Sequence, residues 1–355
     1  MLLNSLAAPK GVKYHCELCG KQATLMCPNC RTVCYCTEAH RDIDEVSIHK
    51  KICGLIQELQ SEKEVFGSAQ QRQQHQERMN MLRKRIVDIG VEQATAALSR
   101  QEYQRAIPAA LQALKYQKEL DSNDRSIVTP YLLLGEAHTG LGKLQRAEEF
   151  LSFAKWVLIS CEETGESRSQ AIIALRGRLH RQFGKLFLFQ DRFGEAEAEF
   201  AADAYYSGLA TGPESPEAAQ CYFHMGNLFY LRKQRQVAFQ FYDKIVEIWQ
   251  SYLRDLVVAG TLTGHETPGF ASETKEMFMK LETVYNQNCG QNHSSTGFLQ
   301  LTIALFMCTL GQEHVSDALD RVGQAHDIFL QSFGQDHPAT RDAANLRVAL
   351  TQSQV

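Results

Sequence analysis

A cluster of cysteines and histidines near the N-terminus constrains this chain more than any other feature. Seven of its eleven cysteines lie between Cys16 and Cys53. With two histidines, six of them form two Cys-x2-Cys pairs, one Cys-x3-His pair and one His-x3-Cys pair. Eight ligands suffice for two zinc ions, because structural zinc takes four Cys or His ligands. The pairs are Cys16 and Cys19, Cys27 and Cys30, Cys36 and His40, and His49 and Cys53.

The spacing within each pair predicts its local structure. Two residues between cysteines allow one tight turn to present both sulfurs to one ion. Three residues between ligands suit a helix, where positions i and i+4 share a face, so we expect a helix from His40 to Cys53. Spacing alone leaves open whether consecutive pairs share an ion or the pairs interleave. Such a local cluster indicates a metal site in a reducing compartment, not a disulfide framework.

The order of these pairs, with Tyr35 before Cys36 and a closing His-Lys-x2-Cys, resembles the MYND-type zinc finger over residues 14–53. The resemblance implies two interleaved zinc sites. It also implies that Cys34 binds no metal, and we expect that residue to be a partly exposed thiol. One zinc would take Cys16, Cys19, Cys36 and His40, and the other Cys27, Cys30, His49 and Cys53.

Two departures from the family pattern affect the expected function. His40 stands where most MYND fingers have cysteine, which zinc accepts equally. The stretch from His40 to His49 is one residue longer than usual and lacks the family's tryptophan, with Val46 nearby. That tryptophan helps some MYND domains to grip proline-rich peptides. We therefore do not expect proline-motif binding here.

Charge and composition narrow the classes of partner. The finger carries seven Lys/Arg and five Asp/Glu over residues 10–53, and each Cys3His site adds one negative charge, so its net charge is near zero. The whole chain has a net charge of −4. We expect no nucleic-acid partner. The N-terminus, MLLNSLAAPKG, lacks a signal-peptide pattern, and no apolar stretch is long enough to span a membrane. We therefore expect a cytoplasmic protein with no membrane partner.

Two further features lie outside the finger. Residues 54–85 are rich in Gln, Glu, Arg and Lys, which predicts a solvated helical linker broken near Gly67-Ser68. The remaining cysteines occur singly in apolar-periodic segments, and we expect small buried hydrophobes there. These cysteines are Cys161, Cys221, Cys289 and Cys308.

From residue 86 onward the pattern is helical and repetitive. In three segments an alanine follows a glycine by twelve positions, as Ala147 follows Gly135. The same relation joins Gly184 to Ala196 and Gly226 to Ala238. This pattern resembles the tetratricopeptide (TPR) repeat, which implies an all-α superhelix over 86–350. A weaker copy contains Ala94, Tyr103, Ala106 and Ala113, and a degenerate one contains Ala304, Gly311, Ala318 and Ala325. The expected repeats lie near 87–120, 128–161, 177–210, 219–252 and 297–332.

A second repeated motif marks the joints between repeats. GPESP, GHETP and GQDHP begin at Gly212, Gly264 and Gly334, each with proline four residues on. They resemble the joints of the longer, kinesin-light-chain-like TPRs. Residues 251–297 are irregular, and we expect one helix there at about 272–288.

A TPR array presents a concave face lined by the first helix of each repeat. The predicted face combines basic side chains with an amide and aromatic group, suited to an acidic, extended peptide. The alternative interpretation is that these are ordinary solvated basic residues together with aromatic residues that only pack against their neighbours. The predicted peptide-binding residues are Arg178, Arg181, Lys185, Gln220, Phe223, Asn227 and Tyr230.

We expect no enzyme and no catalytic residues. Asn292-His293-Ser294 resembles part of the SET-domain methyltransferase motif, but Ser295 stands where that motif has cysteine, and no strand-rich block accompanies it. We interpret this stretch as a polar turn. Closed zinc sites also leave no position for water or substrate. Three histidines in first helices fit packing roles; they are His138, His180 and His224.

The predicted function is a non-enzymatic scaffold that joins proteins through its TPR face and its finger. The combination of a MYND finger with TPRs and no SET domain resembles proteins of cilia and sperm flagella. That resemblance implies an axonemal location, with another axonemal TPR protein and dynein-related components as partners. The alternatives are a nuclear co-regulator adaptor of MYND type and, less favoured, a degenerate SET-type methyltransferase relative.

Overall fold

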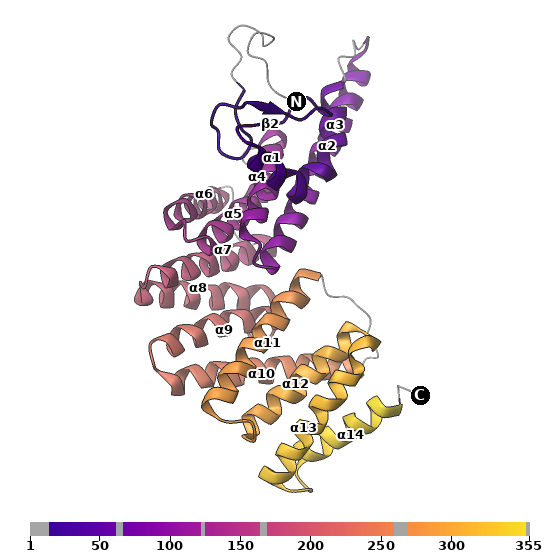
Figure 1. Cartoon of the computed structure of the whole chain (residues 1–355). Helices are drawn as coiled ribbons and strands as arrows, with labels where there is room; N and C mark the ends of the chain where they lie inside the picture. The colour runs from indigo at the N-terminus through magenta and orange to yellow at the C-terminus, as the bar shows by residue number, and fades with distance from the viewer. Residues whose placement is uncertain (1–13, 62–66, 122–124, 164–168, 259–267, 353–355) are drawn as a thin grey trace. The chain divides into compact units, whose positions relative to one another are not determined.

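The computed structural model describes residues 14–61, 67–121, 125–163, 169–258 and 268–352 (Figure 1). Within these ranges the regular structure is helical except for one two-stranded hairpin, so the predicted all-α class is confirmed. The chain divides into two compact units, Met1–Arg192 and Phe193–Val355, and each is described by itself.

The finger begins the first unit with a short hairpin and a helix. Strand β1 (Leu25–Met26) pairs antiparallel with β2 (Cys34–Tyr35). Helix α1 (Glu38–Asp44) begins after Thr37, whose hydroxyl accepts a hydrogen bond from the backbone N–H of His40. A π-helical turn (Glu45–His49) joins it to α2 (Lys50–Ser61). The predicted helix from His40 to Cys53 is therefore present, with one π turn inside it.

The π turn lies in the stretch that is one residue longer than the MYND pattern. A π turn closes its hydrogen bond one residue later than an α turn does, so it accommodates one additional residue without ending the helix. The helix therefore carries the extra residue as a local widening.

The break expected near Gly67-Ser68 is found. Helix α3 (Ala69–Ser99) begins with a capping box in which the Ser68 hydroxyl accepts from the N–H of Gln71 and the Gln71 side chain accepts from the N–H of Ser68. This arrangement satisfies two helix-terminal N–H groups. Toward its C-terminal half α3 buries Ile86 and Ala94.

The helices of the first unit pack in consecutive pairs. Helix α3 packs on α4 (Tyr103–Leu120), and α5 (Val128–Gly140) packs on α4, α6 (Leu144–Glu163) and α7 (Gln170–Phe189). Small residues permit the close contacts. A Cβ atom on Gly135 would lie 2.4 Å from the Leu151 side chain. In the first helix pair, α3 and α4, an alanine replaces the glycine of the repeat pattern. This residue, Ala94, lies twelve positions before Ala106, and both are fully buried.

The second unit continues the pattern of consecutive packing. Helix α8 packs on α9, α9 on α10, α10 on α12, α12 on α13 and α13 on α14. The helix expected at about 272–288 is α11, which starts four residues earlier and packs on α12. The helices are α8 (Phe193–Thr211), α9 (Pro216–Leu231), α10 (Arg235–Val258), α11 (Pro268–Asn288), α12 (Ser294–Leu310), α13 (Val315–Phe333) and α14 (Pro338–Gln352).

Three joints of the second unit each contain a glycine with a similar, positive φ angle. Gly212, Gly290 and Gly334 have φ angles of 96°, 90° and 85°, a region open to glycine. Three residues after each glycine, a Ser or His side chain accepts a backbone N–H bond at the start of the next helix. The Gly290 joint was not predicted because it lacks proline. Gly264 of the GHETP motif lies outside the described residues.

Candidate metal centres

The first predicted ligand set is assembled between the Cys16 loop and the start of α1. Its four ligand atoms, from Cys16, Cys19, Cys36 and His40, lie within 4.8 Å of one another. Nδ1 of His40 is 3.4 Å from the Cys16 sulfur and 3.3 Å from the Cys36 sulfur. The Cys19 and Cys36 sulfurs are 3.5 Å apart. These separations are close to the edges, about 3.6 to 3.8 Å, of a tetrahedron around zinc.

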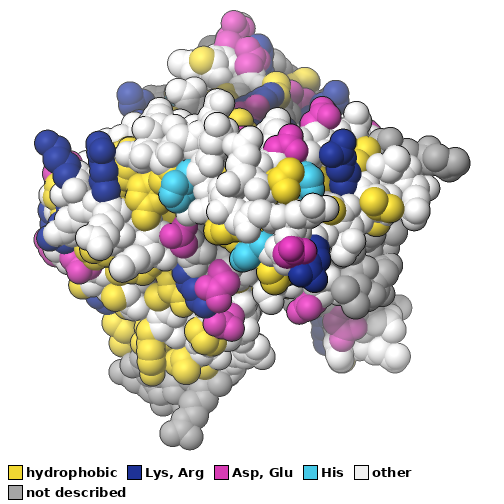
Figure 2. Space-filling view, turned by 90° about the horizontal axis from the view of Figure 1, so that it is seen from below, with side chains coloured by type: hydrophobic (Ala, Val, Ile, Leu, Met, Phe, Trp, Pro, Cys, Tyr) yellow, Lys and Arg dark blue, Asp and Glu magenta, His cyan; other side chains and the backbone are white. Residues whose placement is uncertain are grey.

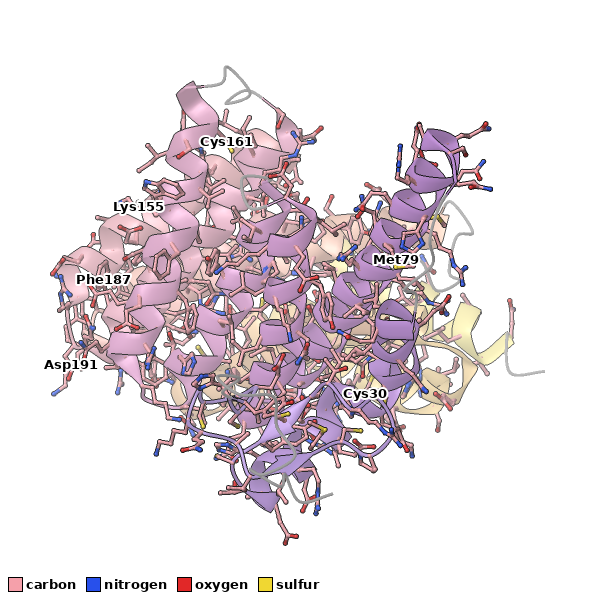
Figure 3. All side chains as sticks on the ribbon, turned by 90° about the horizontal axis from the view of Figure 1, so that it is seen from above. Cys30, Met79, Lys155, Cys161, Phe187 and Asp191 are labelled. Atoms are coloured by element: carbon pink, nitrogen blue, oxygen red, sulfur yellow. The ribbon has the colours of Figure 1, made fainter. Side chains whose placement is uncertain are left out.

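The second set joins the Cys27 knuckle to the π turn and α2. Ligand atoms of Cys27, Cys30, His49 and Cys53 lie within 4.8 Å of one another. Nε2 of His49 is 3.2 Å from the Cys27 sulfur and 3.8 Å from the Cys30 sulfur. The Cys27 and Cys53 sulfurs are 3.8 Å apart. Figure 3 places Cys30 in the finger and Met79 on α3.

Two Cys3His sets fit two zinc ions, as predicted, and they interleave along the chain. The two histidines offer different nitrogens to the metal, Nδ1 in His40 and Nε2 in His49. Each must be neutral to bind zinc, with its proton on the other nitrogen. Burial lowers the pKa of His49 and so favours that neutral form. All four places of each site belong to protein side chains, which is typical of structural zinc.

Sequence reasoning missed the buried carboxyl group behind the second site. Asp44 is fully buried, and its Oδ2 accepts a 2.6 Å hydrogen bond from the Tyr35 hydroxyl. The same oxygen lies 3.9 Å from Nδ1 of His49, on the side of the ring opposite the sulfurs. Burial raises the pKa of Asp44 to about 6, and it raises the pKa of Tyr35. The sequence feature that could have indicated this carboxyl group is an acidic residue five positions before a ligand histidine.

The expectation that Cys34 is a partly exposed thiol is wrong. Its side chain is 3% exposed, because β2 turns it into the interior, and its sulfur donates to the carbonyl of Thr32. Burial raises the pKa of Cys34 to about 11, so the residue stays protonated at neutral pH. Its sulfur belongs to neither of the two ligand sets.

The finger is packed onto the helices that follow it. Glu17 accepts hydrogen bonds from Lys115 and, at 3.3 Å, from Gln112, both on α4. Lys51 of α2 donates a 2.6 Å bond to Gln93 of α3. Apolar residues of the finger also belong to the same hydrophobic core as α3 to α7. The finger is thus one end of the first unit's core.

The three predicted basic residues of the peptide face lie on α7, beside a carboxylate of α5. Lys185 donates a 2.8 Å hydrogen bond to Glu136, and Gln182 donates a 3.0 Å bond to its other oxygen. Burial opposes ionisation of Glu136, but Lys185, Arg178 and Arg181 together hold its pKa below the usual value. This cluster carries three positive charges around one negative charge.

The other four predicted residues lie on α9, in the second unit. Phe223 is 8% exposed and belongs to the hydrophobic core there. Gln220 donates to Glu273 at 3.0 Å. The two remaining side chains take part in bonds within the unit: Asn227 accepts from the Tyr242 hydroxyl, and the Tyr230 hydroxyl accepts from Asn288.

Several described histidines and cysteines outside the finger pack against, or cap, neighbouring structure. His138 stacks on Phe150 with ring centroids 5.3 Å apart, and His224 stacks on Phe200 at the same distance. Asn292 lies in the predicted turn and His293 caps α12, whereas Ser294 is already the first residue of that helix. Cys161 and Cys221 are buried as expected, whereas Cys289 and Cys308 are only half-buried.

Comparison with known families agrees with this geometry. The family model described as the MYND finger matches residues 16–53, a range that begins and ends on zinc-ligand candidates. This part of the chain is a zinc-binding finger of a kind that mediates protein interactions. Among the described helices, none has both the length and the apolar character needed to cross a membrane. Basic and acidic side chains are interspersed over the face shown in Figure 2.

Proposed function

We propose that this protein is a non-enzymatic adaptor, in which two structural zinc ions stabilise one end of a helical-repeat body that binds other proteins. The observation that supports this most directly is the closed ligand set at both metal sites. A site with four protein ligands has no position for an attacking water, so its zinc contributes folding free energy. We place the main binding surface of the scaffold on the helices, with the finger as a second docking surface.

The helix pairs are proposed to be TPR units, with the basic cluster on α7 as a docking surface for an acidic segment. Arg178 is exposed, and Arg181 is half-buried beside it. Arg178, Arg181 and Lys185 all lie close enough to Glu136 to lower its pKa, and guanidinium groups form charge-assisted hydrogen bonds to the carboxylates of a partner. Arg178→Glu with Arg181→Glu should abolish binding of such a partner. Lys185 is left unchanged in this test because it pairs with Glu136.

A second double variant, with two other basic residues changed to glutamate, controls for the change in net charge. Lys233→Glu with Arg235→Glu alters two exposed cations, one in the turn before α10 and one at its first residue, and should leave binding intact. Equal affinity of the α7 double variant and the wild type, measured by calorimetry with the purified partner, would reject the α7 surface.

The order of parts resembles zinc finger MYND domain-containing protein 12, and on that resemblance we propose a place in the axoneme of cilia or flagella. Another axonemal TPR protein and dynein-related components are the proposed partners. Affinity purification from spermatogenic tissue, with cross-linking and mass spectrometry, tests this. Axonemal proteins cross-linked to lysines of the helices would support it. Chromatin proteins cross-linked near Lys21 or Lys50 would favour the nuclear co-regulator instead.

The enzyme alternative has a direct test. A methyl-transfer assay with S-adenosylmethionine should show no transfer above a protein-free control. Measurable transfer that depends on the protein would overturn the non-enzymatic proposal and favour the methyltransferase relative.

A further inference from the structure

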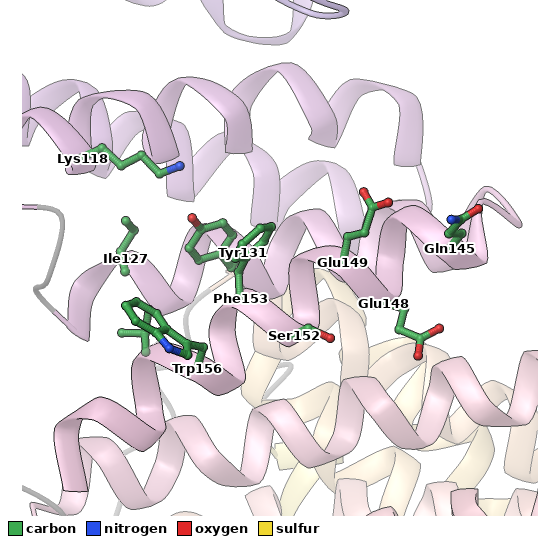
Figure 4. Close-up of a pocket in the computed structure, with 10 residues that line it drawn as sticks. Lys118, Ile127, Tyr131, Gln145, Glu148, Glu149, Ser152, Phe153 and Trp156 are labelled. Carbon is green, nitrogen blue, oxygen red and sulfur yellow. The ribbon is translucent and has the colours of Figure 1, made fainter. Parts of the chain in front are cut away.

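An open groove crosses the first unit on the side of α4 and α6, with the start of α5 beneath it (Figure 4). Its volume is about 890 Å³. One end is aromatic and aliphatic, and the other end is polar and acidic. The apolar end is formed by Ile127, Tyr131, Phe153, Trp156 and Val157, and the acidic end by Gln145, Glu148 and Glu149.

The apolar end holds large side chains that the fold leaves open to water. Phe153 and Trp156 lie about one turn apart on α6 and are 54% and 62% exposed. The Phe153 ring stacks on Tyr131, with centroids 5.6 Å apart and planes at 24°. Lys118 of α4 places its Nζ 5.5 Å from the Tyr131 ring centre. These contacts hold Phe153 and Tyr131 in position, so a partner meets an arranged aromatic surface.

The acidic end lies toward the N-terminus of α6. Glu148 and Glu149 are both exposed there. Arg146 pairs with Glu149 at 3.3 Å, but both members are largely exposed, so the pair is weak and readily exchanged. Glu148 leaves a negative charge beside the groove. A partner complementary to the whole groove therefore carries apolar side chains at one end and a basic side chain at the other.

The walls of the groove determine the kind of backbone that fits. Both walls are α-helices, whose interior N–H and C=O groups bond within the helix, so they offer no edge to an added strand. Contact must come from side chains. The lining of α6 from Gln145 to Trp156 covers twelve residues, a length of about 16 Å, or about three turns of a partner helix.

We propose that this groove binds an amphipathic helix of another protein. Apolar side chains at i, i+3 or i+4, and i+7 enter the end formed by Tyr131, Phe153 and Trp156. A Lys or Arg of the same helix meets Glu148 and Glu149. The groove is formed by α4, α5 with the preceding residue Ile127, and α6. It shares no residue with the basic surface proposed on α7, so a negative result for one proposal leaves the other unaffected.

Peptide selection tests the proposal without knowledge of the natural partner. A phage-displayed library of 16-residue peptides, a length chosen to exceed about three helical turns, is selected on the full-length zinc-loaded protein. Enriched peptides should share apolar residues at helical spacing next to Lys or Arg. Trp156→Glu should weaken their binding at least about thirtyfold, the loss of an interface hot spot. Phe189→Glu, at a position that is 60% exposed on α7, should change nothing.

Two readouts locate the bound peptide. The chain has two tryptophans and Trp249 is fully buried, so acrylamide quenching reports Trp156, and a bound peptide should reduce it. Selection on Glu148→Lys should replace the basic residues of the enriched peptides by acidic ones. Peptides without this charge switch, binding unchanged in Trp156→Glu, or no enrichment at all would each overturn the proposal.

A second copy of this chain is the competing occupant, and sedimentation distinguishes it. The wild-type protein should sediment as a monomer at micromolar concentration. A dimer that Trp156→Glu dissociates and Phe189→Glu does not would assign the groove to self-association and overturn the proposal.

Discussion

The Tyr35 hydroxyl donates a 2.6 Å hydrogen bond to the buried carboxyl group of Asp44. The accepting oxygen is also 3.9 Å from Nδ1 of His49, whose Nε2 faces the Cys27 sulfur. A carboxylate behind a ligand histidine fixes the ring's orientation and increases its basicity toward zinc. Tyr35 therefore positions Asp44, whose carboxyl group lies next to a candidate zinc ligand without a hydrogen bond to it.

Asp44→Asn should weaken zinc binding at the second site by about ten- to a hundredfold, because it removes the carboxyl group that lies 3.9 Å from Nδ1 of His49. Competition with a chromophoric chelator measures the affinity of each site. Asp42→Asn, an exposed change two residues away, is the matched control. Equal affinities of the two variants would show that Asp44 has no influence on the metal.

Cys34→Ala should leave two zinc ions bound, whereas Cys30→Ala should leave one. Both cysteines are buried in the finger, but only Cys30 belongs to a ligand set. Native mass spectrometry counts the ions directly. Loss of a zinc from the Cys34 variant would show that the fifth sulfur takes part in binding.

Removal of zinc should loosen α3 and α4 as well as the finger. Metal binding supplies on the order of 10 kcal/mol of folding free energy in such modules. The apolar side chains of the finger share a core with these helices, and Glu17 bonds to Lys115 of α4. Hydrogen exchange should rise over α3 and α4 after chelation. Amides of α10, in the second unit, provide the internal control and should keep their protection.

Gly226→Ala should destabilise the second unit by about 1–3 kcal/mol through overpacking. The added Cβ would lie 2.4 Å from the Tyr242 ring, which is fully buried and bonded to Asn227. Gly194→Ala on α8 meets no atom within 4 Å and should be neutral or stabilising. Urea unfolding of both variants tests the contrast, and an equal effect would contradict the contact.

Acidification should destabilise the first unit partly through His138. Burial, aided by the charges of Lys143 and Arg146, lowers the pKa of His138 from 6.5 to about 4. Between these values the unfolded chain binds a proton that the folded chain does not, so stability falls as the pH falls from about 6.5 to 4. His138→Phe retains the stacking on Phe150 and should lose less stability from pH 7 to 4.5 in urea titrations. An equal loss would exclude His138 as a source.

Ligand spacing predicted the metal centres well because each pair acts locally. A Cys-x2-Cys turn or an i, i+4 helix pair presents two ligands without reference to the rest of the fold. Spacing alone did not decide which ligand pairs share a zinc ion, and the resemblance to the family supplied that assignment. Asp44 was missed because its role depends on the three-dimensional approach of Tyr35 and His49.

The helical pairs were predictable where a glycine permits close contact. Gly135 and Gly226 each face a bulky side chain of the next helix. The groove at Phe153 and Trp156 was not predicted, since a sequence does not show which apolar residues of an amphipathic helix stay exposed. Cys34 is the opposite case, a residue expected to be partly exposed that is buried. Its burial follows from the packing of β2, and a strand of two residues is too short for a pattern of alternating burial to show in the sequence.

The π turn at Glu45–His49 has a consequence for how such fingers vary. One residue added to a regular α-helix rotates everything beyond it by about 100°. A widened turn absorbs that rotation, so His49 and Cys53 keep their angular phase relative to His40. The metal requires that its ligands point toward it. The number of residues between the ligands can therefore differ by one. A sequence pattern with a fixed gap between these histidines would therefore miss fingers whose ligands still converge, as those of this chain do.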